Sequence, residues 1–561
     1  MGEGTNAREP PMAYNLIVLL IVLPAAAGFG RAVRRSTQLP SPRSYLRALA
    51  VDGFLGLLVL GAIGTGLNFF CAMSAWVSGG LMAIGWVAFF CCASAVPHKR
   101  RTSDWVFLAA AVLLVSLHAA REVSFFDTGL YHLQAVLWAK RQAVPFGLAN
   151  LYGRLGINGT WFVVSALCWL PGMSVAACVS VAGVIVVLFG ALVFECIRQV
   201  MTTAPARSST GDWLGVLCVY PLCYDTFIAP LPAVVSVSTD LPVLFLTLTA
   251  LILLLSADED LNGRMGISLL LAAFAFSIKL TGIPLFFLVG LAVVIRMVRS
   301  PQRRGPLVWS AGVSAAVALL WLARNVVLSG CPLYPSLAGR LPVRWAVPRD
   351  IPLMGWIRSF AMDTAGTPET TLASWRWVIP WGRKMLETEC IVVAIAIAAG
   401  ALIACALFAR RWRAAELLAW LLSLAGVAYW FALAPDPRFG YGCIFAAGAI
   451  PLAVALTRLP PTNLATVRML LCLALAIAPL IRGAMLPHVA APGYWKMPAI
   501  PQVALVSKRT KQGDVVHLPA SEFSLWAAPV PSTAYFRPNL RIEWTSPRQY
   551  RAFVLDDWDK Q

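Results

Sequence analysis

The chain has 561 residues, of which 59% are hydrophobic and 13% are charged, and its mean hydropathy is +0.74. No soluble protein needs this balance, and apolar stretches of about 17–25 residues recur along the chain, so we predict an all-α polytopic protein of a lipid bilayer. The formal net charge of +19 does not indicate nucleic-acid binding, because the basic residues lie in short loops between apolar segments, as is typical of cytoplasmic loops.

Hydropathy predicts about fourteen transmembrane helices. The first begins at Tyr14 and is expected to be retained rather than cleaved, because Glu3 precedes it and a basic run follows it. A further apolar stretch, 158–171, is short for a span and is expected to lie as a helix at the outer surface. The predicted spans are 14–30, 51–70, 74–96, 105–120, 175–197, 213–227, 241–255, the two arms of a hairpin over 265–299, 307–327, 391–409, 416–433, 439–456 and 469–481. The hairpin is expected to turn at 279–284, where Gly282 and Pro284 interrupt the helix.

The alternation of basic and neutral loops predicts the orientation of these helices. Arg31 and Arg34 follow the first span and the basic run 98–101 follows the third, so both loops are assigned to the cytoplasm. Counting spans from these loops places the amino terminus, the loop around Asp127 and the carboxyl terminus on the outer side.

A polar segment interrupts the apolar pattern between Arg121 and His132. A carboxylate beside a membrane helix is costly to place, so Asp127 in this segment is a candidate functional residue. The sequence 128–142 predicts an amphipathic helix in the membrane interface, with Asp127 at its amino end and with Gln134, Lys140 and Arg141 on its polar face. Asp127 is then either an N-cap that satisfies free backbone N–H groups or a general base that accepts a proton from an incoming hydroxyl or amine.

The ionisable residues in or against apolar segments all fall on the outer side in this topology, whereas random placement would scatter them. They are Asp127, His132, Asp225, Asp240, Lys279, Arg324 and Arg438. We infer a single polar site at the outer membrane interface. Arginine can hold a phosphate through two parallel hydrogen bonds and lysine adds a point charge, so Lys279, Arg324 and Arg438 are the candidate phosphate-binding residues. For the two arginines, snorkelling from the ends of spans is the alternative.

Other residues near this site are candidate substrate contacts. They are Glu122, Tyr131, His132, Arg154, Asp225, Asp240 and Asn325. The long outer loop 329–388 also carries five tryptophans, which either anchor the loop in the interface or stack on carbohydrate. They are Trp345, Trp356, Trp375, Trp377 and Trp381. The spacing of the cysteines and the five scattered histidines gives no set of metal ligands.

Several motifs, taken in order along the chain, resemble the GT-C superfamily of membrane glycosyltransferases, which take a sugar from a polyprenyl-phosphate donor. In that family an acidic residue in the first outer loop is the catalytic base, and Phe126–His132 looks like this element. Arg324-Asn325 followed by Gly330-Cys331-Pro332-Leu333-Tyr334-Pro335 is similar to a recurrent "RN…G-x-P-x-x-P" pattern. The other similar segments are Ser277–Gly282 and Pro437–Tyr441.

The resemblance covers about Trp105 to Ile481 and departs from the family in three ways. Three predicted spans precede the one that would be the family's first. The acidic loop has a lone Asp127 where a paired acidic motif is common, which puts metal dependence in doubt. No cofactor is certain, and a divalent metal stays an alternative that is not favoured. The tail is shorter than the periplasmic domains that some members carry. The chain as a whole resembles uncharacterised bacterial members that have tails of this kind.

The resemblance implies three parts: 1–104 with extra amino-terminal transmembrane helices, 105–483 as a GT-C-like catalytic core with outer loops 119–173 and 329–388, and 484–561 as a periplasmic tail. In the tail, 513–518 and 534–536 are expected to form short strands, giving a small irregular cap over the outer face.

The implied function is inverting transfer of a sugar from a polyprenyl-phosphate donor to an envelope glycan or lipid acceptor. The reaction would occur at the periplasmic face of a bacterial inner membrane, with Asp127 as base and Lys279, Arg324 and Arg438 on the donor phosphate. Two alternatives remain open: an O-antigen polymerase or ligase, with its arginines in one large loop, and a transporter or flippase of lipid-linked sugars, with charges near the bilayer midplane.

Overall fold

The computed structural model describes residues 13–42, 44–92, 100–119, 123–202, 208–224, 226, 233–257, 260–300, 304–349, 353–387, 412–458, 500–546 and 549–556. The spans expected at 391–409 and 469–481 lie outside the described residues, so the predicted number of spans stays a prediction.

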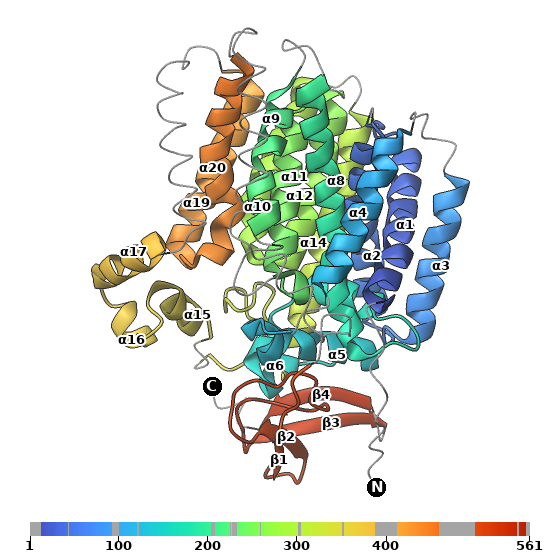
Figure 1. Ribbon diagram of the computed structural model, residues 1–561. Coiled ribbons are helices and arrows are strands. Elements are labelled where there is room, and N and C mark those ends of the chain that lie inside the picture. The colour runs from blue at the N-terminus through green and yellow to red at the C-terminus, as the bar shows by residue number, and fades with distance from the viewer. Residues whose placement is uncertain are drawn as a thin grey trace.

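The chain is a helical membrane protein, and its long helices pack side by side in one bundle (Figure 1). Among the described residues, eight helical segments are long and apolar enough to cross a membrane: 15–36, 45–67, 175–202, 261–278, 280–299, 305–329, 414–433 and 437–458. Three shorter apolar helices accompany them. The bundle helices are α1 (Ala13–Ser36), α2 (Tyr45–Leu67), α3 (Ala75–Cys91), α4 (Thr102–His118), α8 (Val181–Thr202), α9 (Thr210–Leu217), α10 (Val219–Cys223), α11 (Asp240–Leu255), α12 (Leu261–Ile278), α13 (Ile283–Arg299), α14 (Gly305–Ser329), α19 (Ala414–Leu433) and α20 (Pro437–Arg458).

Short helices and all the described strands gather at one end of the bundle, which we call the capped end (Figure 1). The short helices are the π-helix η2 (Thr128–His132), α5 (Leu133–Arg141), α6 (Leu148–Leu151), the 3-10 helix η3 (Gly153–Gly156), α7 (Thr160–Cys168), α15 (Leu353–Met362), α16 (Pro368–Thr371) and α17 (Val378–Glu387). The remaining 3-10 turns are η4 (Val175–Ser180), η7 (Ala233–Val235), η8 (Leu280–Gly282) and η9 (Trp375–Trp377).

The stretch 158–171 forms the short helix α7 at the capped end, where it packs against α2 and α5. All nine residues of α7 are buried, as expected for a helix that is apolar on every side. Its place at the outer surface of a membrane stays a prediction.

The tail forms two antiparallel hairpins, one from β1 (Leu505–Arg509) and β2 (Val515–Pro519) and one from β3 (Leu540–Ser546) and β4 (Gln549–Leu555). Strand β2 confirms the strand expected at 513–518. The strand expected at 534–536 is wrong, because this segment forms bends and pairs with no strand among the described residues. Just before it, Thr533 Oγ1 donates to the carbonyl oxygen of Leu151 at 2.9 Å.

The tail is bonded to the capped end through its second hairpin. The Phe146 N–H donates to Arg551 O at 3.0 Å, and the Phe553 N–H donates to Phe146 O at 2.9 Å. Gln134, expected on the polar outer face of the interfacial helix, is fully buried, and its Nε2 donates to the carbonyl oxygens of Trp526 and Ala528. The tail therefore covers this helix.

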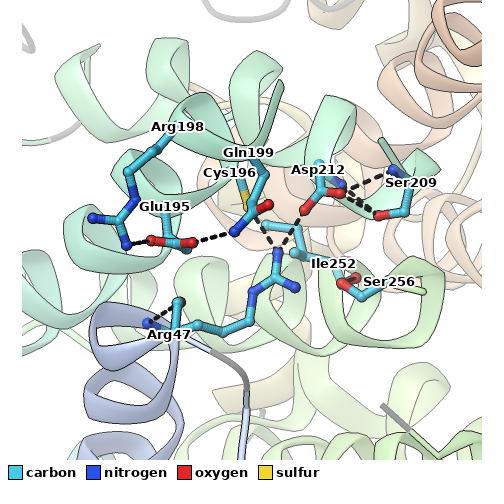
Figure 2. Close-up of polar contacts among 10 residues, drawn as sticks. Arg47, Glu195, Cys196, Arg198, Gln199, Ser209, Asp212, Ile252 and Ser256 are labelled. Carbon is cyan, nitrogen blue, oxygen red and sulfur yellow. Dashed lines mark hydrogen bonds and ion pairs between the residues drawn. The ribbon is translucent and has the colours of Figure 1, made fainter. Parts of the chain in front are cut away.

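Buried ion pairs hold the opposite end of the bundle together. Arg47 Nη2 lies 2.6 Å from Asp212 Oδ1, and the side chain reaches from α2 toward α8 and α9 (Figure 2). Asn68, which follows α2, donates to Gln142 O at 3.1 Å, so α2 ends at the capped end and begins at the opposite end. Arg34 pairs with Asp52 at 2.6 Å.

Two further buried carboxylates form ion pairs at this end of the bundle. Glu195 pairs with Arg198 and accepts a hydrogen bond from Gln199 (Figure 2). Glu416, at the start of α19, pairs with Arg458, at the end of α20, at 2.9 Å. Basic residues near the helix ends, among them Arg34 and Arg198, thus form ion pairs with carboxylates at this end of the bundle.

Candidate functional site

A cavity of about 810 Å³ lies at the capped end. Its walls are mostly apolar and come from η2, α6, α12, α15, α19, α20 and the tail. The apolar and aromatic lining includes Leu130, Leu151, Ile157, Phe162, Ile278, Trp321, Leu353, Trp356, Phe360, Trp430 and Leu433. Concave, mostly apolar sites with a few convergent polar groups are the usual form of small-molecule sites in proteins.

Asp127 and Arg438 form an ion pair on the cavity wall, with Arg438 Nη1 3.1 Å from Asp127 Oδ2. The second residue of α20 is Arg438, and its Nε also lies 3.3 Å from Asp436 Oδ1. Asp127 directly precedes η2, as the sequence indicated. Its backbone is already helical and its side chain makes no capping hydrogen bond, so the N-cap interpretation is wrong and the carboxylate faces a cation instead.

Lys279 and Asp240 form a second ion pair on the same wall. Lys279 follows α12 in an extended conformation, and the chain then re-enters a helix at η8 and α13, with Pro284 in the first turn. This confirms the hairpin predicted to turn at 279–284. The break in the helix is what brings the lysine to the cavity, where its Nζ lies 3.9 Å from the centre of the Phe439 ring.

Tyr131 and His132 lie beside these pairs, with their ring centres 4.3 Å apart. His132 is 2% exposed, and burial lowers its pKa from 6.5 to about 4, so the ring is neutral at pH 7. Its Nδ1 atom has no hydrogen-bond partner among the described residues. Burial also raises the pKa of the Tyr131 hydroxyl above its usual value.

A second group of polar residues lies where the tail meets η3. Arg154 lines the cavity together with Tyr152, and its guanidinium lies 5.8 Å from the centre of the Tyr131 ring. The tail adds Phe523, Tyr535 and Arg537 to the lining. Sequence reasoning missed these three, although the run Tyr535-Phe536-Arg537, aromatic and basic in a mostly polar tail, was a usable signal.

Arg324, which the sequence assigned to the donor phosphate together with Lys279 and Arg438, is absent from the lining of this cavity. Its side chain is buried beside the end of α2, where Nη1 donates to Asn68 Oδ1 at 3.1 Å. Asn325 braces the loop after α14 by donating to Pro332 O at 2.8 Å and is also absent from the cavity lining. Two other predicted contacts, Glu122 and Asp225, lie outside the described residues.

The five loop tryptophans divide among three environments. Trp356 lines the cavity. Trp375, Trp377 and Trp381 pack on one another and reach Phe431 of α19, and Trp381 Nε1 donates to Pro435 O at 2.7 Å. This cluster joins α17 to the α19–α20 turn, while Trp345 Nε1 donates to Val326 O at 3.0 Å.

The described residues contain no cluster of three or more His, Cys, Asp or Glu side chains that could hold a metal ion. Asp127 and Asp240 each face a side-chain cation. The cavity wall therefore offers two carboxylates and two cations beside an apolar space, and Arg438 is shared between Asp127 and Asp436, which lies outside the lining.

Comparison with known proteins gives one match. A family model described as a domain of unknown function, DUF8201, matches residues 12–445. No curated protein matches the chain, and no solved structure does. The matched region contains both ion pairs of the cavity wall and ends before the tail.

Proposed function

The chain belongs to the DUF8201 family, whose function is unknown, and we propose that it is a membrane glycosyltransferase. It would move a sugar from a polyprenyl-phosphate donor to a glycan or lipid acceptor at the periplasmic face of a bacterial inner membrane. The observation that carries the proposal is the 3.1 Å pair between Asp127 and Arg438, beside the Lys279–Asp240 pair, on the wall of a large apolar cavity.

The proposed reaction assigns one task to each side chain. The acceptor hydroxyl oxygen attacks the anomeric carbon, and the bond from that carbon to the phosphate oxygen breaks. Asp127 takes the hydroxyl proton as general base. The leaving polyprenyl phosphate gains one negative charge, which Arg438 and Lys279 stabilise. Arg324 has no part in this scheme.

The two ion pairs suit a site that is prepared for an anion before it arrives. Arg438 already neutralises Asp127, so neither charge is left uncompensated at the edge of an apolar space. A donor phosphate competes with the carboxylate for the guanidinium, because arginine binds phosphate oxygens through two donors at once. Its arrival would release Asp127 toward the acceptor hydroxyl, and the base would become free only when the donor is in place.

The transporter alternative expects ionisable residues near the middle of the membrane. The charged residues of the cavity instead lie at helix ends: Asp240 is the first residue of α11, Lys279 follows α12, and Arg438 is the second residue of α20. We therefore favour an enzyme acting at the membrane interface.

The direct test is a transfer assay with the full chain in lipid vesicles. A panel of undecaprenyl-phosphate hexoses, each radiolabelled in the sugar, is incubated with the vesicles and an envelope extract as acceptor. We expect the wild-type chain to release polyprenyl phosphate from one donor and move the label into the extract. Failure to consume any donor, with the wild type and Asp127→Asn indistinguishable, would contradict the proposal.

A further inference from the structure

Helices α15, α16 and α17 form an arm beside the bundle, residues 353–387, which we call the side arm. It lies at the capped end, next to the end of α19 (Figure 1). Its first helix, α15, lines the cavity through Leu353, Ile357 and Phe360. Whatever fixes the position of the side arm therefore also fixes one wall of the cavity.

The helices of the side arm are bonded to one another. Ser359 Oγ of α15 donates a hydrogen bond to Thr371 Oγ1 of α16, with 3.2 Å between the two oxygen atoms. After α16 the chain passes through η9 directly into α17. A contact that fixes α17 is thus transmitted to α15 through short, bonded segments.

One face of α17 packs on the bundle. Trp377, just before the helix, and Met385 are buried, and the Trp381 ring lies 5.4 Å from the ring of Phe431 in α19, measured between centres. Trp381 Nε1 also donates to the carbonyl oxygen of Pro435, in the turn between α19 and α20. Because α19 is long and apolar enough to cross a membrane, these contacts place α17 at the level where a span ends.

The opposite face of α17 is exposed and mostly apolar. Ile379 is 68% exposed, Leu386 is 66% exposed, and Trp375, one turn before Ile379, is 73% exposed. Arg383 lies between the two aliphatic residues at the spacing of a single helix face and is exposed as well, and the helix ends at the exposed Glu387. An exposed apolar patch rimmed by polar residues marks a site of contact with a protein or a membrane.

An apolar stripe of the same kind runs along α19 and ends beside α17. Its exposed members are Leu417, Leu421, Leu424, Ala428 and Ala432. On a helix that crosses a membrane, an exposed apolar stripe faces lipid acyl chains. The stripe ends at Ala432, next to the residue that contacts the Trp381 ring. The lipid-facing surface of α19 therefore continues onto the outer face of α17.

We propose that α17 is an interfacial helix whose partner is the phospholipid of the leaflet at the capped end. Trp375, Ile379 and Leu386 insert among the acyl chains near the headgroups, and Arg383 binds lipid phosphate. The bilayer then fixes the side arm, and with it the α15 wall of the cavity. A second protein chain on the same face is the competing occupant.

The first test is photo-crosslinking of the full chain in vesicles of phosphatidylethanolamine and phosphatidylglycerol. The photoreactive amino acid p-benzoylphenylalanine inserts into C–H bonds that it touches, so contact with lipid raises the mass of the protein by one phospholipid. It replaces Ile379 or Leu386 on the outer face. The buried Met385 of the same helix is the matched control, Leu421 of α19 is the lipid-facing reference, and the exposed Val506 of the tail is the reference outside the membrane.

We expect lipid adducts at Ile379 and Leu386 in yields similar to that at Leu421, and none at Met385 or Val506. Two outcomes would overturn the proposal. One is a crosslink from Ile379 or Leu386 to a second protein chain. The other is the lack of a lipid adduct at both positions when Leu421 reacts.

The second test asks whether the bilayer fixes the side arm. Ile379→Asp places a charge among acyl chains under the proposal and only in water otherwise, and an acidic residue near the amino end of α17 suits the helix itself. In nanodiscs, amide hydrogen exchange across 353–387 should become about tenfold faster or more, because transfer of an isoleucine side chain from water to an apolar medium is favourable by an amount of this order.

Val506→Asp is the matched control, since it makes the same kind of change at an exposed aliphatic residue of the tail. It should leave exchange across 353–387 unchanged. Exchange at the wild-type rate in Ile379→Asp would contradict the role assigned to the bilayer. Neither test uses sugar transfer, so both outcomes are independent of the proposed function.

Discussion

Arg438 donates a hydrogen bond to Asp127 at 3.1 Å and so joins two residues that are 311 positions apart in the chain. The pair closes the polar side of the cavity between η2 and α20. Arg438 neutralises this carboxylate, and whether a bound ligand separates the pair decides whether Asp127 can act as a base.

Asp127→Asn should abolish sugar transfer while the protein still inserts and folds. The amide keeps the size of the carboxylate but cannot take a proton, and removal of a general base costs about 10²–10⁴-fold in rate. The helix should be unaffected, because the Asp127 side chain makes no capping bond. Initial rates of donor consumption in vesicles measure the effect, and undiminished transfer would remove Asp127 from the mechanism.

Arg324→Gln should lower stability and leave donor binding unchanged. The buried Arg324 holds Asn68 Oδ1, and removing one partner of a buried hydrogen bond costs about 1–3 kcal/mol. Arg438→Gln is the matched comparison, and it should weaken donor binding. Thermal unfolding and donor affinity measured on both variants separate these effects, and weaker donor binding in Arg324→Gln would return this residue to the site.

The stability of the protein should fall as the pH is lowered from about 6.5 toward 4. His132 has a pKa of about 4 when folded, below its value near 6.5 in an unfolded chain, so the unfolded chain binds more protons in this range and is favoured. The full effect is up to about 3 kcal/mol. Thermal unfolding of His132→Gln should depend less on pH in this range than that of the wild type. Equal pH dependence in the two proteins would contradict the buried neutral state.

Gly129→Ala should loosen the tail, because the added Cβ would lie within 3 Å of the Trp526 ring. Protease cleavage within 500–556 should become faster. Trp526→Ala in the same chain makes room for the methyl group, so the double variant should be less sensitive than the sum of the two single changes. Gly80→Ala, with no atom near its added Cβ, is the control. Purely additive effects would show that the two residues do not touch.

The sequence predicted the features that depend on local pattern. Apolar stretches located the membrane helices, and Gly282 with Pro284 located the turn that presents Lys279. The placement of Asp240, Lys279 and Arg438 at one end followed from counting spans between basic loops, because the direction of each helix follows from its order in the chain.

The errors concern contacts between distant segments. Arg324 lies near the end of a span at the capped end, as predicted. The direction of its side chain is set by Asn68, which follows α2 and is 256 positions away in the chain. No pattern near Arg324 reports that neighbour. The tail contribution was missed for the same reason: Arg537 reaches the cavity because Gln134 fixes the tail through Trp526, 392 positions further along.

The buried ion pairs at the opposite end also constrain when the protein can assemble. Arg34 and Asp52 are 18 positions apart. At a synthesis rate of about 5–20 residues per second, Asp52 therefore follows Arg34 within roughly 1–4 s. Arg47 precedes Asp212 by 165 positions and must wait roughly 8–33 s for its partner at the same speed. During that delay its charge needs water or another acceptor, so the contact that joins α2 to α9 can form only after α9 has been synthesised.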